Sequence, residues 1–186
     1  MITQELEEKI EGATETQTIE FKDSCDWNIR TFAKDILALS NVQDGGYIII
    51  GVEDGNFSRK GITDNQKETY KIDVMKDQMT AFADPHVNFT LDFPKDREGK
   101  EYAVIHVFQF EEVPVICRKD SADTKAGVLY YRNKNRRAES APVSNSYDMR
   151  DIVQLATIRM MQKKVELGFT VTASVKKKLD DELNGL

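Results

Sequence analysis

The sequence is poor in the residues that build metal and disulfide sites. It has two cysteines, Cys25 and Cys117, and two histidines, His86 and His106. The cysteines form no CxxC pair, and these four residues lack the spacing of zinc ligands, which argues against a zinc centre. We expect reduced thiols and therefore a cytoplasmic protein. His86 and His106 have no partner pattern, and we interpret both as structural.

Long apolar runs and nucleotide-binding glycine motifs are also missing. No stretch approaches the length of a membrane span, and residues 1–12 are polar and acidic, unlike a signal peptide. We therefore expect no membrane association. Neither GxxxxGK[ST] nor GxGxxG occurs, so a nucleotide-binding fold is not supported. A chain of 186 residues, 40% hydrophobic and 31% charged, suits one ordinary globular domain.

Acidic residues outnumber basic ones, which gives a net charge of −6 and argues mildly against a protein that coats nucleic acid indiscriminately. The distribution is uneven, because four of the six residues from 132 to 137 are basic and none is acidic. Arginine and lysine bind phosphates, and the preceding tyrosines could stack on unpaired bases. The alternative is a solvated loop with one tyrosine in the core. The candidate nucleic-acid-binding residues are Tyr131, Arg132, Lys134, Arg136 and Arg137.

The centre of the chain is the segment from Asn41 to Gly55, which reads NVQDGGYIIIGVEDG. Its run of one tyrosine and three isoleucines predicts a strand buried on both faces. Gly51 interrupts the run, which predicts a bulge or a close backbone approach. The strand ends in Glu53 and Asp54, so it delivers carboxylates to its own end.

Hydrophobic periodicity predicts α+β architecture: a single domain with a mixed β-sheet flanked by three long helices. The expected helices are 1–11, 28–42, 64–83 and 147–167, with a short one at 175–183. The expected strands are 15–22, 47–50, 87–93, 101–108, 113–117 and 128–132. This divides the chain into an N-terminal helix (1–12), the domain (13–168) and a tail or short helix (169–186).

An acidic group forms the first candidate site. Glu15 and Glu20 are five residues apart at a probable strand entry, and Asp54 ends the central strand. Three converging carboxylates would hold a hard divalent cation, Mg²⁺ or Mn²⁺, which activates water and neutralises phosphodiester charge. Lys22 would then stabilise the extra negative charge of the transition state. The spacing alone favours the simpler interpretation that these are solvated acids at strand ends.

Several segments together resemble the AlbA-like domain of the Schlafen family. They are E-x4-EFK from Glu15, a helix running into LSNVQDGGYIIIGVEDG, then VPV and YYRNKNRRA. The resemblance spans about residues 15–138 and implies a lobe like a Schlafen core. Thr16, where serine is usual, and the adjacent acids Glu53 and Asp54 depart from the family pattern.

The resemblance implies two functions. Bacterial domains of this type are commonly described as DNA-binding modules, whereas animal Schlafen cores are similar to metal-dependent endoribonucleases. Their catalytic centre is two glutamates five apart plus a downstream aspartate, which fall here on Glu15, Glu20 and Asp54. These three residues would be catalytic and hold the metal, and Lys22 would contact the scissile phosphate.

We therefore expect a metal-dependent endoribonuclease that acts on structured RNA such as tRNA rather than on DNA, in antiviral defence or in a larger defence complex. The alternative is a non-catalytic DNA- or RNA-binding module, a regulator or sensor subunit. A protein-interaction subunit is a third possibility, suggested by the negative charge alone. Animal Schlafen cores resemble two related lobes around one substrate, which implies a homodimer here, with helix 147–167 as a candidate contact.

Overall fold

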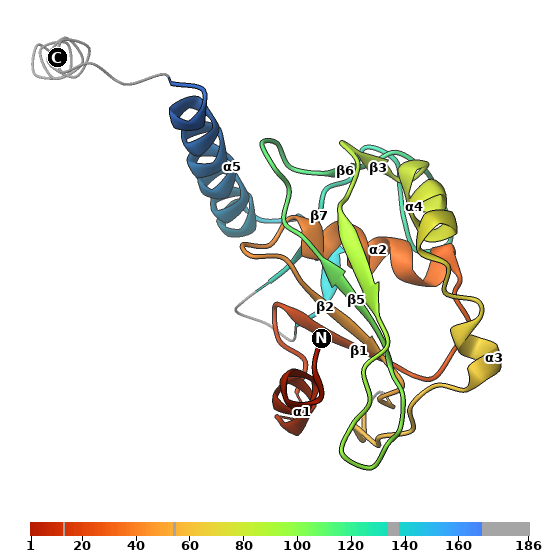
Figure 1. Ribbon diagram of the computed structural model, residues 1–186. Helices are drawn as coiled ribbons and strands as arrows, with labels where there is room; N and C mark the ends of the chain where they lie inside the picture. The colour runs from red at the N-terminus through yellow and green to blue at the C-terminus, as the bar shows by residue number, and fades with distance from the viewer. Residues whose placement is uncertain (13, 54, 134–137, 169–186) are drawn as a thin grey trace, which may run out of the picture.

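The computed structural model describes residues 1–12, 14–53, 55–133 and 138–168 (Figure 1). Four predicted site residues, Asp54, Lys134, Arg136 and Arg137, lie outside the described residues, as does the expected helix 175–183. The helices are α1 (Thr3–Glu11), α2 (Ile29–Ser40), α3 (Asp64–Lys67), α4 (Ile72–Thr80) and α5 (Ser146–Glu166). The strands are β1 (Ile19–Lys22), β2 (Gly46–Ile50), β3 (Ala83–Asp84), β4 (Phe89–Asp92), β5 (Ala103–Val107), β6 (Ile116–Cys117), β7 (Tyr130–Arg132) and β8 (Ser140–Pro142).

The main sheet has the strand order β1-β2-β5-β4. β1 runs parallel to β2, and the other two pairs are antiparallel, so the predicted mixed sheet and α+β class are confirmed. Two short ribbons, β3 with β6 and β7 with β8, complete the strands. β2 lies between two neighbours and its three isoleucines have no exposed surface, as the apolar run predicts.

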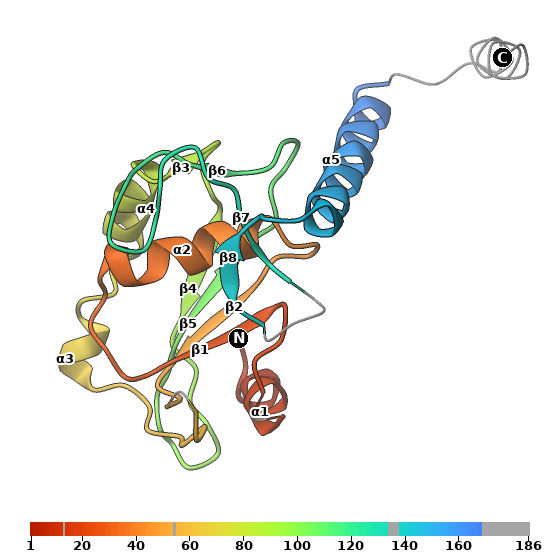
Figure 2. The same ribbon diagram turned by 180° about the vertical axis from the view of Figure 1, so that it is seen from behind.

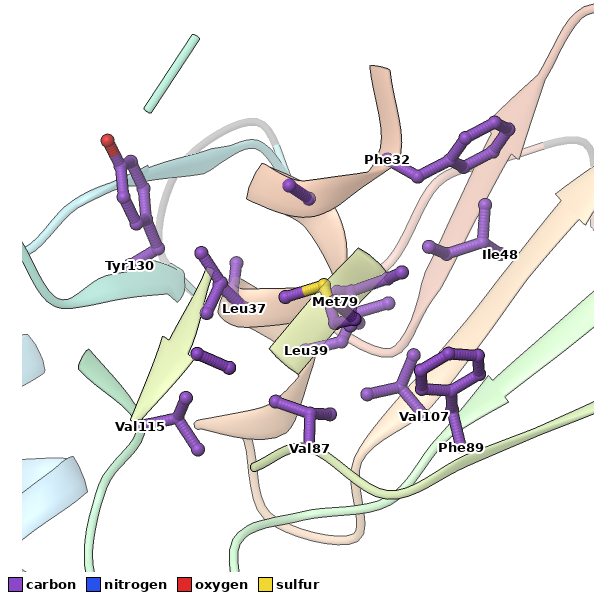
Figure 3. Close-up of a cluster of buried hydrophobic side chains, with 14 of the residues drawn as sticks. Phe32, Leu37, Leu39, Ile48, Met79, Val87, Phe89, Val107, Val115 and Tyr130 are labelled. Carbon is purple, nitrogen blue, oxygen red and sulfur yellow. The ribbon is translucent and has the colours of Figure 1, made fainter. Parts of the chain in front are cut away.

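Alternation along β2 divides the core between the two faces of the sheet. Ile48 and Ile50 join the larger cluster with α2 and α4, and Ile49 joins the smaller one with α1. Figure 3 shows the larger cluster, in which side chains from the helices, the sheet and the short ribbons meet. The sheet is therefore covered by α2 and α4 on one face and in part by α1 on the other.

Asn41 fastens the end of α2 to the ribbons. Its amide donates to the carbonyls of Val115 and Tyr130, both at 2.9 Å, and accepts from the backbone N–H of Val115 at 2.8 Å. The side chain is fully buried, so these bonds satisfy polar groups that water cannot reach. The asparagine of the LSN segment thus has a structural role.

The bulge expected at Gly51 is present. The backbone N–H groups of Gly51 and Val52 both donate to the carbonyl of Lys22, which is the two-against-one pairing of a bulge. Gly51 has φ +111°, and a Cβ there would lie 2.8 Å from the Cα of Gly61. Both the backbone angle and the close approach require glycine.

Two predicted elements were wrong in extent. The helix expected at 64–83 is divided into α3 and α4, because Thr69 and Tyr70 turn inward between them. Thr69 accepts from the N–H of Trp27 at 2.8 Å, and the Tyr70 hydroxyl donates to the carbonyl of Cys25 at 2.8 Å. The strand expected at 15–22 begins only at Ile19, after a tight turn.

Helix α5 matches its predicted range to within one residue at each end. Figures 1 and 2 show it projecting from the body of the domain. Its apolar side chains are only partly buried: Ile152 and Ala156 are buried, whereas Met149, Val153 and Met160 are more than two-fifths exposed. Among the described residues, no helix is both long and apolar enough to cross a membrane.

Candidate functional site around Glu20

A tight turn brings the two predicted glutamates together. Thr16 and Ile19 exchange backbone hydrogen bonds, which folds Glu15 back along β1. β1 is an edge strand, and the Glu15 carboxylate accepts the otherwise unpaired N–H of Phe21 at 3.3 Å. Glu15 consequently lies beside Glu20, which the extended strand expected at 15–22 would not have allowed.

The environment of Glu15 shifts its titration toward neutral pH. Partial burial, followed by the charge of Glu20, raises the pKa of Glu15 to about 7, while the N–H of Phe21 and the charge of Arg132 oppose the shift. Glu15 is therefore protonated in part of the molecules at neutral pH.

Glu20 and Lys22 share one face of β1 because side chains two apart in a strand point the same way. The Lys22 ammonium lies 2.7 Å from Glu20 Oε1 and 2.8 Å from Asp35 Oδ2. Burial alone would lower the pKa of Lys22, but attraction to Asp35 and then Glu20 raises it above its ordinary value. Lys22 is thus a fixed cation between two carboxylates.

Arg132 lies inside the protein, with no exposed surface. Its Nη1 donates to Glu20 Oε2 at 2.5 Å, and its Nη2 donates to the carbonyls of Thr16, Ile19 and Ala138 at 3.0 to 3.1 Å. The predicted role of Arg132 as a surface phosphate contact does not fit this position. The guanidinium instead clamps the β7–β8 ribbon onto the turn before β1.

Tyr131 also points inward. It is 5% exposed, and its hydroxyl accepts from the Gln17 amide at 3.0 Å. Burial, followed by the charge of Asp151, raises the pKa of Tyr131 to about 12. Tyr130 is buried as well, so neither tyrosine offers a ring face for stacking on a base.

Glu15, Glu20, Lys22, Asp35 and Arg132 form one charged cluster, and Asp35 is the member that the sequence analysis missed. It comes from α2, is 4% exposed, and pairs with Lys22. The signal was an aspartate inside the apolar segment IRTFAKDILALS, since a buried carboxylate needs a cationic partner.

The cluster is close to charge balance without a metal ion. Lys22 and Arg132 offset Glu20 and Asp35, both oxygens of Glu20 are engaged in ion pairs, and Glu15 titrates near neutrality. Within the described ranges, no group of three or more histidine, cysteine or acidic side chains could hold a metal ion. The described residues therefore do not fit a resident Mg²⁺ or Mn²⁺.

The third predicted ligand, Asp54, lies outside the described residues. Its neighbour Glu53 is occupied within its own loop, where its carboxylate lies 2.6 Å from the Lys60 ammonium and accepts from the Asn56 amide at 2.8 Å. These two contacts, Lys60 first, lower the pKa of Glu53.

Comparison with known proteins places this cluster inside a matched domain. A family model described as Schlafen, AlbA_2 matches residues 15–140. A curated relative is the uncharacterized ATP-binding protein UU034 of Ureaplasma parvum serovar 3, which is 26% identical over 168 residues. The match covers 82% of this chain, and the chain spans about 45% of the length of that relative.

Two solved structures share the fold at 16% sequence identity. The DIP2311 protein of Corynebacterium diphtheriae aligns with a TM-score of 0.52 over 80% of this chain and 27% of its own. The N-terminal domain of a RecG-related protein of Nitrosomonas europaea aligns with a TM-score of 0.51 over 78% of this chain and 97% of its own. At this identity the likeness concerns the fold alone.

Proposed function

The chain belongs to the Schlafen AlbA_2 family, and from this we propose that it is a nucleic-acid-binding domain that takes RNA in preference to DNA. The family suggests a nucleic-acid-related function. The preference for RNA is supported by the resemblance to animal Schlafen cores. The proposed binding surface is formed by Lys22 and the segment that connects β7 to β8.

The buried pair between Arg132 and Glu20 is the observation that carries this proposal. It joins the β7–β8 ribbon to β1, and the Gln17 amide adds a second tie by donating to the carbonyl of Arg132 at 2.9 Å. The sequence Lys-Asn-Arg-Arg at 134–137 connects two described residues, Asn133 and Ala138, of this anchored ribbon. Three basic residues thus follow Arg132 closely in sequence, and Arg132 belongs to the same charged cluster as Lys22.

The test is binding of one fluorescent RNA hairpin, and of the matched DNA duplex, between about 50 and about 200 mM salt. A triple variant, K134A/R136A/R137A, should weaken binding and flatten its dependence on log salt by up to about 2.7, since each phosphate contact contributes about 0.9. The matched control is K71A/K95A/K125A, three exposed lysines elsewhere on the domain. Equal behaviour of the two triple variants would contradict the proposed surface.

A second candidate function is RNA cleavage, which the pKa of Glu15 favours. A carboxylate that titrates at about 7 can accept or donate a proton at neutral pH, and it lies beside Glu20, which pairs with the fixed cation Lys22. In this proposal Glu15 takes the proton of the attacking hydroxyl as its oxygen bonds to phosphorus and the P–O bond to the leaving oxygen breaks, and the leaving oxygen takes a proton from water. Lys22 balances the charge that develops on the phosphate. The Mg²⁺ or Mn²⁺ expected from the sequence stays a prediction.

The cleavage assay uses purified tRNA with Mn²⁺, Mg²⁺ or EDTA. Glu15→Gln should abolish cleavage while leaving binding intact, because it removes the titrating group and keeps an oxygen for the N–H of Phe21. Glu53→Gln is the control. Glu20→Gln is less informative, since it also disturbs the pair with Arg132. Wild-type protein that binds RNA but cuts none of it under any of these conditions would leave the binding domain as the function.

We also propose that the chain forms a homodimer through α5. The exposed apolar side chains of Met149, Val153 and Met160 support this, since a solvated helix seldom presents such a row. Light scattering should give a dimer mass that Val153→Glu converts to a monomer mass, while Gln162→Glu does not. A monomer mass for the wild type at micromolar concentration, with and without RNA, would contradict the dimer.

A further inference from the structure

Three aromatic rings stack on the sheet face that α1 covers only in part. Tyr47 on β2 and His106 on β5 are direct cross-strand partners, and Phe108 follows His106 by two residues on the same face. The ring centroids of Tyr47 and His106 are 4.3 Å apart with planes 10° apart. Those of His106 and Phe108 are 4.4 Å apart at 50°. The Tyr47 and His106 rings therefore stack face to face, and the Phe108 ring lies tilted against His106, so the three rings form one aromatic row (Figure 1 shows β2 and β5 side by side).

One end of this row of rings is covered by a side chain, and the other end is exposed to solvent. The Lys9 ammonium lies 3.9 Å from the centroid of the Tyr47 ring, so a cation already covers that end. Burial, and then the charge of Lys9, lowers the pKa of His106, so its ring is neutral at pH 7. Phe108 ends the stack and is 41% exposed. A further planar group can therefore join only beside Phe108.

Phe108 borders a hollow with a volume of about 630 Å³. Thr90, Asn88 and Gln109 line it with groups that donate and accept hydrogen bonds. Two cations, Lys76 and Arg159, and two acids, Asp44 and Glu111, line it as well. The hollow thus offers an aromatic face, hydrogen-bonding groups at its edges and nearly balanced charge.

We propose that Phe108, backed by His106 and Tyr47, is a stacking platform for an unpaired base of a nucleic-acid strand. A nucleobase has both a flat π face and a hydrogen-bonding edge, and this hollow matches both. An apolar side chain of a protein partner would match the ring but use none of the polar edge groups, of which Asn88 also donates to Glu111 and Gln109 also accepts from the N–H of Asp44. Lys76 and Arg159 lie where they can contact the phosphates of the same strand.

The inference rests on the proposed function, because it assumes that the domain binds nucleic acid. The hollow has balanced charge, however, and can therefore be tested separately from the basic segment 134–137. Stacking does not release counterions, so changes at Phe108 alter affinity and leave its salt dependence unchanged. Changes at 134–137 alter the salt dependence. The two sites can therefore fail independently.

The experiment compares Phe108→Leu, Phe108→Trp and the neighbouring control Val113→Ala on a single-stranded RNA that carries 2-aminopurine. Thermal unfolding of each variant checks the fold, and leucine keeps the apolar bulk of the exposed ring. Phe108→Leu should lower affinity between about fivefold and about a hundredfold and abolish the 2-aminopurine quenching seen with the wild type. Phe108→Trp should preserve both, Val113→Ala should change neither, and an abasic strand should bind wild type and Phe108→Leu equally.

Several results would contradict the proposal that Phe108 is a stacking platform. Equal affinity of wild type and Phe108→Leu, with the salt slope still lowered by K134A/R136A/R137A, would refute it and leave the proposed function standing. Equal weakening on the base-containing and abasic strands would assign Phe108 a structural role. Adenosine monophosphate that binds as tightly as the strand would reassign the platform to free nucleotides. A wild-type protein that binds no nucleic acid would refute both proposals.

Discussion

Replacing Arg132 with methionine should unfold the ribbon that carries the basic segment. The change removes a fully buried guanidinium and leaves Glu20, itself 8% exposed, without one of its two cations. The carbonyls of Thr16, Ile19 and Ala138 lose a donor as well. Breaking one side of a buried pair costs about 3–5 kcal/mol, and methionine fills most of the volume, so little cavity cost is added.

Urea denaturation followed by circular dichroism at pH 7 measures this loss. A loss of about 3–5 kcal/mol is a large share of the stability of a domain of this size. Arg132→Lys should cost less, since an ammonium restores the charge but not the planar fork. The double variant Glu20→Gln/Arg132→Met should cost less than the sum of the single variants, because neither partner then remains as an unpaired buried charge.

Two outcomes would refute the reasoning. A loss below about 1 kcal/mol for Arg132→Met would place the guanidinium at the surface, where the sequence analysis put it. Strict additivity in the double variant would show that Arg132 and Glu20 do not act as a pair. A surface phosphate contact, by contrast, would lose affinity for RNA at unchanged stability, so one set of variants separates the two roles.

Three further predictions concern the same cluster and its support. Glu15→Gln should flatten the pH dependence of stability, because the folded wild type binds an extra proton between the ordinary pKa of 4.5 and the folded value of about 7. Wild-type stability should therefore fall as pH rises through this window, by roughly 1 kcal/mol after allowing for solvent screening at this partly exposed position, and pH-dependent urea titrations of both proteins check it. Asp35→Asn should cost about 1–3 kcal/mol by removing a buried counter-ion of Lys22, and full stability in a thermal melt would argue against that pair. Asn41→Ala should cost roughly 3 kcal/mol, because it leaves the N–H of Val115 and two carbonyls buried without partners, and hydrogen exchange at Val115 should rise with it.

Local sequence patterns were enough to predict the central strand of the sheet and the start of the helix that packs on it. The apolar run of β2 predicts a central buried strand, and Asn28 predicts the start of α2, where its side chain accepts from the N–H of Arg30. Both depend on neighbours in sequence, as does the bulge at Gly51. The helix expected at 64–83 failed because its break depends on Thr69 and Tyr70 contacting residues more than 40 positions away.

The candidate site likewise combines features that depend on local sequence with features that depend on long-range packing. The sequence by itself placed Glu15 and Glu20 five residues apart, but the strand expected at 15–22 would have separated them on opposite faces. The turn from Thr16 to Ile19 is what brings them together. Only the tertiary structure decided which cations they meet. Arg132, 112 residues along the chain, turns inward to Glu20, since all three residues of β7 are buried, and Asp35 reaches Lys22 from α2. Long-range ion pairs of this kind follow from how elements pack, and no spacing along the chain records them.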